Sequence, residues 1–276
     1  MTDVTRIISL VWDLWLHLPL GSLKYSAMWC AFCVLVHIFV GWATPEIIDN
    51  FDKRIAQEKD RRDWYNRAVS IMHASVMFCR ALFYWILFNP AIILPTGTNQ
   101  TALLRGAGAG FDVITLDIMM GYLWYDILIE VSKEKISKTT LLHHIVGYVS
   151  LFCTRATGSK LGCFYFMLVF VAEGSTPVLH TLWLLHKLEC TAWALYKALA
   201  FLLLVLFFAL RIVLGPYTIH HLATHQAAWA EEEPHGTWMY RLLLAISIVF
   251  VSINYYWFQL LVKMAMPKKS RKKKET

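Results

Sequence analysis

The chain has 276 residues, of which 58% are hydrophobic and 16% are charged. This composition excludes an ordinary soluble globular domain and indicates a membrane protein with several spans. The formal net charge of +7 gathers beside the apolar stretches and in the C-terminal tail, and no RNA- or DNA-binding motif accompanies it. We therefore expect contact with anionic lipid and not with nucleic acid.

The first predicted element is an amphipathic lumenal segment over residues 1–24, which lies on the membrane through Trp12 and Trp15. Seven apolar stretches follow, each long enough to cross a hydrocarbon core of about 30 Å. They cover residues 25–44, 69–94, 108–131, 139–155, 161–186, 192–215 and 237–262. The expected fold is an all-α membrane bundle of about seven helices over residues 25–262, followed by a basic tail over residues 263–276.

The connections between these stretches alternate in their content of Lys and Arg, and the basic ones are the first, third and fifth. The positive-inside rule then predicts a cytosolic C-terminus and a lumenal N-terminus. Asn99 begins a glycosylation sequon in a connection that this orientation makes lumenal. Lys273 and Lys274 resemble the dilysine retrieval signal that coat machinery reads. We therefore expect a multi-pass protein of the endoplasmic reticulum membrane.

Ionisable and polar side chains occur inside the predicted spans. A charged group there costs roughly 2.5–3.5 kcal/mol even on lenient insertion scales, so such residues usually face a cavity. The predicted orientation places them near the midplane or in the cytosolic half of five spans. They are His73, Asp126, His143, His144, Glu173, His180 and Asn254. Their similar depth predicts one site that opens to the cytosol.

Helical spacing refines this site. One face of the second span carries residues spaced three or four positions apart, namely Asn66, Ser70, His73 and Met77. Pro177 should kink the fifth span, because it removes an amide and its ring clashes with the carbonyl of Glu173. Adjacent helical residues point about 100° apart. His143 and His144 are therefore not expected to face one partner equally.

Each of these residues also has a simpler interpretation. A single histidine in a span often makes only an interhelical hydrogen bond, and Asp126 would then be a helix-packing residue. Asp112, Asp117 and Arg211 lie at another depth. We expect them to serve structural ion pairs or polarity on the lumenal side.

No metal site is expected, because the spans hold one His-His pair and lack the second histidine box of diiron lipid oxidases. His221 and His225 lie near His235 in the last lumenal connection, where we expect a solvated loop, with a weak metal site as the alternative. The six cysteines are scattered. Cys153 and Cys163 are expected to be free thiols in the core, with a lumenal disulfide as the alternative.

Four blocks carry a family resemblance: the run Trp64 to His73, Gly121-Tyr122 with Asp126, His143-His144, and the run Ala172 to Pro177. In this order they resemble the TLC domain of the translocating-chain-associating, Lag and ceroid-lipofuscinosis proteins, over about residues 60–260. The match is closer to the small TLC-domain-only and ceroid-lipofuscinosis branches than to ceramide synthases, whose longer signature after the histidine pair is missing. The resemblance implies an endoplasmic-reticulum lipid protein whose active relatives transfer acyl chains from acyl-CoA.

The leading hypothesis is a lipid acyltransferase that moves an acyl chain from acyl-CoA to a lysophospholipid, a glycerophosphodiester or a sphingoid base. His143 or His144 is expected to act as general base or nucleophile, and Asp126 to orient it. The expected contacts to the acceptor are His73, Tyr122, Glu173, His180 and Asn254. Acyl-CoA is the co-substrate, and no other cofactor is expected.

The alternative hypothesis is a protein without catalysis. It would bind or sense lipid, or act as a cargo receptor that recycles to the endoplasmic reticulum through its dilysine tail. The tail, the missing synthase signature and the histidine-rich lumenal connection motivate this alternative. The sequence leaves open the acceptor, the acyl length and whether two copies form a homodimer.

Overall fold

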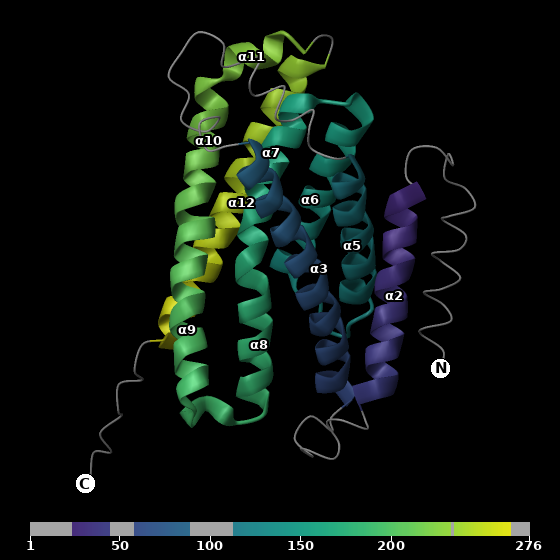
Figure 1. The fold of residues 1–276 in the computed structure, drawn as a ribbon, viewed down its shortest axis with the longest axis vertical. Helices are drawn as coiled ribbons and strands as arrows, with labels where there is room; N and C mark the ends of the chain where they lie inside the picture. The colour runs from purple at the N-terminus through teal and green to yellow at the C-terminus, as the bar shows by residue number, and fades with distance from the viewer. Residues whose placement is uncertain (1–23, 45–57, 89–112, 233–234, 266–276) are drawn as a thin grey trace.

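The computed structural model describes residues 24–44, 58–88, 113–232 and 235–265, and all regular structure in these ranges is helical (Figure 1). The elements are α2 (Lys24–Thr44), α3 (Glu58–Phe88), α5 (Val113–Val131), α6 (Lys138–Thr157), α7 (Lys160–Phe170), η4 (Val171–Ser175), α8 (Thr176–Lys187), η5 (Cys190–Ala192), α9 (Ala194–Phe207), η6 (Phe208–Val213), α10 (Leu214–Thr224), α11 (Gln226–Ala230) and α12 (Gly236–Ala265). The expected all-α class is confirmed. The amphipathic segment up to residue 23, the sequon at Asn99 and the dilysine tail lie outside the described residues.

In the described ranges, the part of each expected span that the structure covers lies in a helix or in consecutive helical segments. Span five becomes α7, η4 and α8, and span six becomes α9, η6 and α10. Among the described residues, four segments are long and apolar enough to cross a membrane, namely 24–44, 160–187, 194–224 and 236–265. The chain is thus a multi-pass membrane protein. The number seven stays a prediction, since α5, for example, carries Asp117, Asp126 and Glu130 within 19 residues.

Successive long helices alternate in direction. In Figure 1 the α5–α6 and α8–α9 turns lie toward the lower end of the bundle, and the α6–α7 turn and α11 lie at the upper end. Lys135 and Lys187 therefore belong to one end, and Glu232 to the other. This arrangement agrees with the alternation of charge in the sequence. Which end faces the cytosol stays a prediction.

Local capping explains the turn between α6 and α7. Gly158 takes the left-handed conformation (φ 64°) at the end of α6, and its N–H donates to the carbonyl of Thr154. The hydroxyl of Ser159 then caps α7 by accepting from the N–H of Gly162 at 2.9 Å. Glu232, from beyond α11, accepts from the Ser159 hydroxyl at 2.6 Å and from the N–H of Leu161 at 3.0 Å. One carboxylate thereby joins the start of α7 to the α11–α12 connection.

A glycine permits the close packing of α2 against α5. A Cβ added to Gly121 would collide with the backbone carbonyl oxygen of Ser26 and would lie 3.0 Å from the backbone nitrogen of Cys30. Both contacts are to backbone, which cannot rotate away. Gly121 belongs to one of the blocks that carry the family resemblance, and its role is to let two helices approach each other.

Two spans leave α-helical geometry inside the bundle. After α7 the chain makes the 3₁₀ turn η4, and α8 begins at Thr176 with Pro177 in its first turn. The structure thus has a break where the proline predicted a kink, and the missing amide costs little in a first turn. Span six contains the π-helical segment η6, which packs against η4. Irregular backbone within a membrane is tolerated where it is buried in protein or lines a cavity.

The connection after span six is largely helical, and this corrects the expectation of a solvated loop. The helical run continues to Thr224, and His221 is only 4% exposed. Nδ1 of His221 lies 3.0 Å from the hydroxyl of Tyr165, and its ring stacks on that of His225 at a centroid distance of 4.1 Å. Pro216 did not end the helix because it stands in the first turn of α10, directly after the π-helical segment.

Two expectations about cysteine and metal chemistry also fall on described residues. Cys153 and Cys163 are both free thiols, as expected. Within the described ranges, no group of three His, Cys, Asp or Glu side chains is placed to hold a metal ion. The expectation of no metal site itself stays a prediction.

Candidate membrane-embedded site

An ion pair joins α5 to α6. Nδ1 of His144 lies 2.7 Å from Oδ2 of Asp126, and both side chains are largely buried, at 13% and 5% exposure. The α5–α6 turn sets the register of this pair, because the carboxylate of Glu130 accepts from the N–H of Ser137 at 2.6 Å and from Nζ of Lys133 at 2.8 Å. A carboxylate beside Nδ1 holds an imidazole in one orientation and stabilises its protonated form.

His143 points elsewhere, as the helical geometry predicted. Its ring meets Phe250 edge-on at a centroid distance of 4.5 Å and lies 5.1 Å from the ring of Trp257, both on α12. Its Nδ1 is buried and has no hydrogen-bond partner in the described part of the chain. The two histidines therefore have different roles: His144 pairs with Asp126, and His143 lines a cavity.

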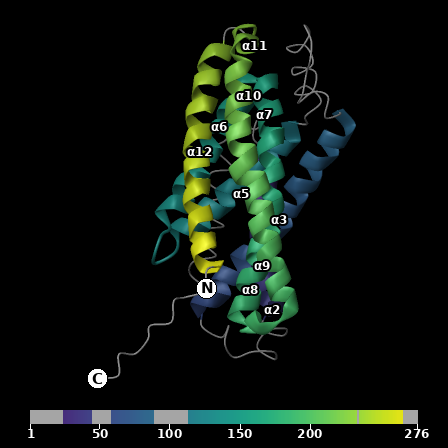
Figure 2. The same ribbon diagram turned by 90° about the vertical axis from the view of Figure 1, so that its left-hand side faces the viewer.

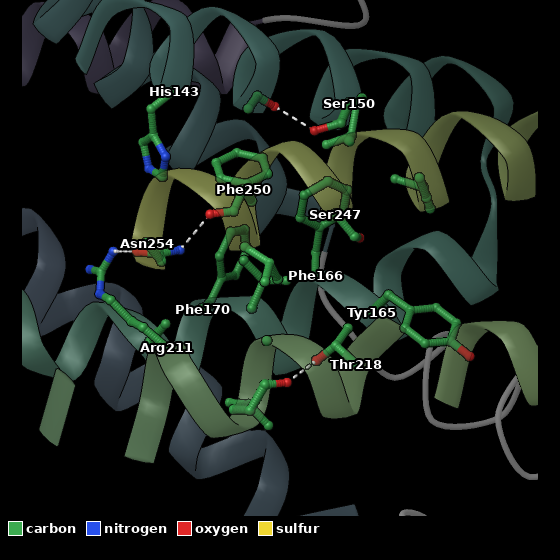
Figure 3. Close-up of a pocket in the computed structure, with 18 of the residues that line it drawn as sticks. His143, Ser150, Tyr165, Phe166, Phe170, Arg211, Thr218, Ser247, Phe250 and Asn254 are labelled. Carbon is green, nitrogen blue, oxygen red and sulfur yellow. Dashed lines mark hydrogen bonds between the residues drawn. The ribbon is translucent and has the colours of Figure 1, made fainter. Parts of the chain in front are cut away.

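The cavity has a volume of about 110 Å³ and lies between α6, the α7–η4 segment, the η6–α10 segment and α12. Figure 2 shows α12 beside the α9–α10 run that forms one of its walls. In Figure 3, His143, Arg211 and Asn254 lie at one end, and Tyr165 and Thr218 lie at the other. Most of the lining is apolar; His143, Arg211 and Asn254 form a polar end, and single polar side chains such as Ser150 and Thr218 lie elsewhere along it. That amphipathic character is typical of a site for a lipid.

Arg211 organises the polar end of the cavity. Its Nε donates to the Ser175 hydroxyl at 2.8 Å, one Nη donates to the Thr176 hydroxyl at 3.0 Å, and the other donates to Oδ1 of Asn254 at 3.2 Å. The Thr176 hydroxyl in turn donates to Oε2 of Glu173 at 3.1 Å. The network thereby connects η6 to η4, α8 and α12.

His73, on α3, lies outside this cavity and is fully buried, with contacts to α2 and α5. Its Nδ1 accepts from the indole N–H of Trp29 at 3.1 Å, and its Nε2 lies 3.1 Å from the sulfur of Met119. Its ring stacks on that of Tyr122 at 3.9 Å, and the Tyr122 hydroxyl lies 2.9 Å from that of Ser70. These contacts use the face of α3 that the sequence spacing predicted.

His180 also lies outside the cavity lining. Its Nδ1 accepts from Nη1 of Arg67 at 2.8 Å, because a guanidinium can only donate. The guanidinium of Arg67 also lies over the ring of Trp183, at 4.3 Å from its centroid. This contact fastens α3 to α8.

A family model described as the TLC domain matches residues 63–263. The chain belongs to the TLC domain family. It is also similar to TLC domain-containing protein 4-B of Xenopus laevis, with 24% identity over 188 residues, which cover 67% of each chain.

The four blocks that resemble the TLC domain meet in the bundle. They fall on α3, α5, α6 and the junction of η4 with α8. Within this TLC domain, Asp126 contacts His144, whereas His143 and Glu173 line the cavity together with Asn254. The expected convergence therefore has two parts: an ion pair with a cavity beside it, and two histidines that join helices, the fully buried His73 and the partly buried His180. Ligand contact by any of these residues stays a prediction.

Sequence reasoning missed Arg211 as part of this TLC-domain site. It assigned Arg211 to the lumenal side because the sixth span was expected to end at residue 215. The helical run extends over residues 194–224, which puts Arg211 near its middle and beside Asn254. The sequence feature that could have identified Arg211 as a site residue is its position as a lone arginine within a long apolar run. Asp117, by contrast, does form an ion pair, with Arg155 at 3.3 Å.

Proposed function

We propose that this TLC-domain protein is an acyl-CoA-dependent lipid acyltransferase of the endoplasmic reticulum membrane. The observation that carries the proposal is the buried pair of His144 and Asp126, with Nδ1 and Oδ2 2.7 Å apart, next to an amphipathic cavity. A buried carboxylate–imidazole pair at membrane depth has an energetic cost, and such pairs therefore usually mark a functional site. Orientation of a basic imidazole by a carboxylate is what acyl transfer to an alcohol or amine requires.

In the proposed reaction, the Nε2 lone pair of His144 removes a proton from the hydroxyl or amine of the acceptor lipid. The acceptor oxygen or nitrogen attacks the thioester carbonyl, a carbon–oxygen or carbon–nitrogen bond forms, and the carbon–sulfur bond breaks. The CoA thiolate leaves with the proton that His144 received. Asp126 remains a carboxylate and stabilises the imidazolium between these steps.

The cavity holds the lipid in this proposal. Its apolar length receives an acyl chain, and Glu173 and Asn254, which line the polar end together with His143, contact the polar part of a substrate. His73, Tyr122 and His180 contribute by fixing helix positions, because their side chains contact other helices and not the cavity. The exposed Lys135 and Lys138 attract the phosphates of acyl-CoA at the proposed cytosolic end.

The test uses the purified full chain in nanodiscs with a long-chain acyl-CoA and a panel of lysophospholipids, glycerophosphodiesters and sphingoid bases. Free CoA thiol and the mass of the acylated product are measured together. His144→Gln keeps a donor for Asp126 but has no basic nitrogen, and it should lower turnover about 10²–10⁴-fold. His186→Gln, at the exposed end of α8, is the matched control. Wild-type turnover by folded His144→Gln would exclude the proposed mechanism.

A lipid-binding protein without catalysis is the second candidate. It is favoured by one observation: the cavity is lined by His143, whereas the paired His144 is not part of its lining. The same experiment separates the two candidates. Lipid retained by folded protein without CoA release for any acceptor supports binding, sensing or cargo escort, and acceptor-dependent CoA release supports the enzyme.

A further inference from the structure

Arg211 is the charged group at the polar end of the cavity whose hydrogen-bonding capacity is only partly used. A guanidinium has five N–H groups. In the described part of the chain, Arg211 donates three hydrogen bonds, to Ser175, Thr176 and Asn254. All three acceptors are neutral oxygens, and one N–H remains on each Nη. A cation at membrane depth with neutral partners and free donors lining a cavity is arranged to receive an anion.

The backbone supports this arrangement. Arg211 lies in the π-helical segment η6, which packs against the 3₁₀ segment η4. π-Helical turns inside α-helices are rare and frequent at functional sites. In Figure 3 the Arg211 side chain reaches Asn254, at the end of the cavity where His143 also lies. Both irregular segments thus place a charged side chain on one cavity wall, Arg211 from η6 and Glu173 from η4.

Glu173 does not neutralise Arg211 by direct contact. The Thr176 hydroxyl stands between them, accepting from Nη of Arg211 at 3.0 Å and donating to Oε2 of Glu173 at 3.1 Å. This leaves the remaining guanidinium N–H groups for a ligand. Arg211 attracts a bound anion and Glu173 repels it, and the reverse holds for a bound cation. The effects of substituting the two residues on ligand affinity therefore report the sign of the ligand's charge.

The shape of the cavity restricts the rest of the ligand. Its lining extends from Arg211 to Leu222 along one helical run, which corresponds to about 16 Å. Phe166, Phe170 and other apolar side chains line the cavity over this length. An apolar lining of this length suits a hydrocarbon chain.

We propose that Arg211 binds the oxyanion of a single-chain lipid, a carboxylate or a phosphate, with the lipid's hydrocarbon chain lying in the cavity. That this lipid is a substrate rests on the proposed function, whereas its binding does not. The proposal selects among the acceptors named above: an anionic lysophospholipid fits, whereas a glycerophosphodiester, which has no hydrocarbon chain, and a cationic sphingoid base do not. Binding of a carboxylate would instead describe the acyl chain in its free-acid form.

The test measures equilibrium binding of radiolabelled lipids to the full chain in phosphatidylcholine nanodiscs, without acyl-CoA, and subtracts empty nanodiscs. The probes are oleate, oleoyl lysophosphatidate, sphingosine and monooleoylglycerol, each of which has a single 18-carbon chain and which differ in head-group charge. Arg211→Gln should weaken binding of the anionic probes roughly tenfold or more. Glu173→Gln should tighten it several-fold, because a nearby negative charge is removed.

Controls separate ligand binding from folding and from catalysis. Arg155→Gln removes a guanidinium that pairs with Asp117 and does not line the cavity, so it should leave the affinity unchanged. Each variant is first checked by size-exclusion chromatography and thermal melting. If Arg211→Gln does not fold, Arg211→Lys replaces it, and a several-fold weakening is expected because a lysine cannot reproduce the guanidinium fork.

The outcomes are distinct. Tighter binding of oleate or lysophosphatidate than of the neutral probe, with the opposite effects of Arg211→Gln and Glu173→Gln, supports the proposal and identifies which oxyanion is preferred. Preferential binding of sphingosine, or anion binding that folded Arg211 variants leave unchanged, overturns it. His144→Gln is expected to retain lipid binding and to lose acyl transfer. The binding assay therefore tests the role of Arg211, and the CoA-release assay tests the proposed enzyme.

Discussion

Nδ1 of His144 lies 2.7 Å from Oδ2 of Asp126, which stands 18 positions earlier in the sequence and on the neighbouring helix. The adjacent His143 instead packs against Phe250 of α12. Two consecutive residues therefore contribute to different parts of the candidate site.

Asp126→Asn should reduce acyl transfer through its effect on His144. The amide keeps the size of the carboxylate but cannot stabilise an imidazolium, so kcat should fall about 10²–10⁴-fold with little change in KM. The measurement is CoA release against acceptor concentration. A change in KM alone, with kcat preserved, would assign Asp126 to substrate binding.

The ion pair should also contribute to stability. His144→Ala leaves a buried carboxylate without its partner, which costs about 3–5 kcal/mol. The double variant Asp126→Leu with His144→Leu removes both charges and should be less destabilised than the single variant. Thermal melting in detergent compares the two, and a double variant that is destabilised as much as the single variant or more would contradict the coupling.

Gly121→Ala should destabilise the packing of α2 against α5. The added Cβ collides with the backbone carbonyl of Ser26, so the helices must separate at a cost of about 1–3 kcal/mol. Gly158→Ala is the matched control, because no atom lies within 4 Å of its added Cβ and only the strain at φ 64° remains, about 1 kcal/mol. Equal shifts of the melting temperature would contradict the steric explanation.

Trp29→Phe should lower stability without changing substrate affinity. It leaves Nδ1 of the fully buried His73 without its donor, which costs about 1–3 kcal/mol. Because His73 contacts Trp29, Met119 and Tyr122 and does not line the cavity, KM for acceptor and acyl-CoA should remain at the wild-type value. A raised KM in folded protein would indicate that His73 takes part in ligand binding.

Glu232→Ala should loosen the start of α7. The carboxylate accepts from the Ser159 hydroxyl and from the N–H groups of Lys160 and Leu161, so its loss should cost about 1–2 kcal/mol. Glu134→Ala, at an exposed position of the α5–α6 turn, is the control and should change the melting temperature little. Hydrogen exchange at the first turn of α7 locates the effect.

Several features of the site were predictable because they depend on helical periodicity alone. The spacing of four residues predicted a shared face of α3, and three of them are buried while the first is partly buried: Asn66, Ser70, His73 and Met77. The break at Pro177 follows from proline's missing amide. The divergence of His143 and His144 follows from the turn per residue of an α-helix. Such properties need no knowledge of neighbouring helices.

Other features depended on where a helix ends and what packs beside it. Arg211 was assigned to the wrong depth because the span was expected to end at residue 215, whereas the helical run continues past Pro216 to Thr224. His221 was expected in a solvated loop for the same reason and is instead buried against Tyr165. A sequence pattern does not reveal a π-helical turn, which changes the face that every later residue presents.

The sequence by itself determined that this protein is a helical membrane bundle of the TLC domain family, with histidines and acids inside its spans. Apolar length, periodicity and four ordered blocks suffice for that, since they are local properties of the chain. Only the tertiary structure decided that Asp126 contacts His144, that His143 lines the cavity and that Arg211 joins Glu173 and Asn254 at its polar end. Those pairings depend on the rotation and offset of neighbouring helices, which packing fixes and local spacing does not encode.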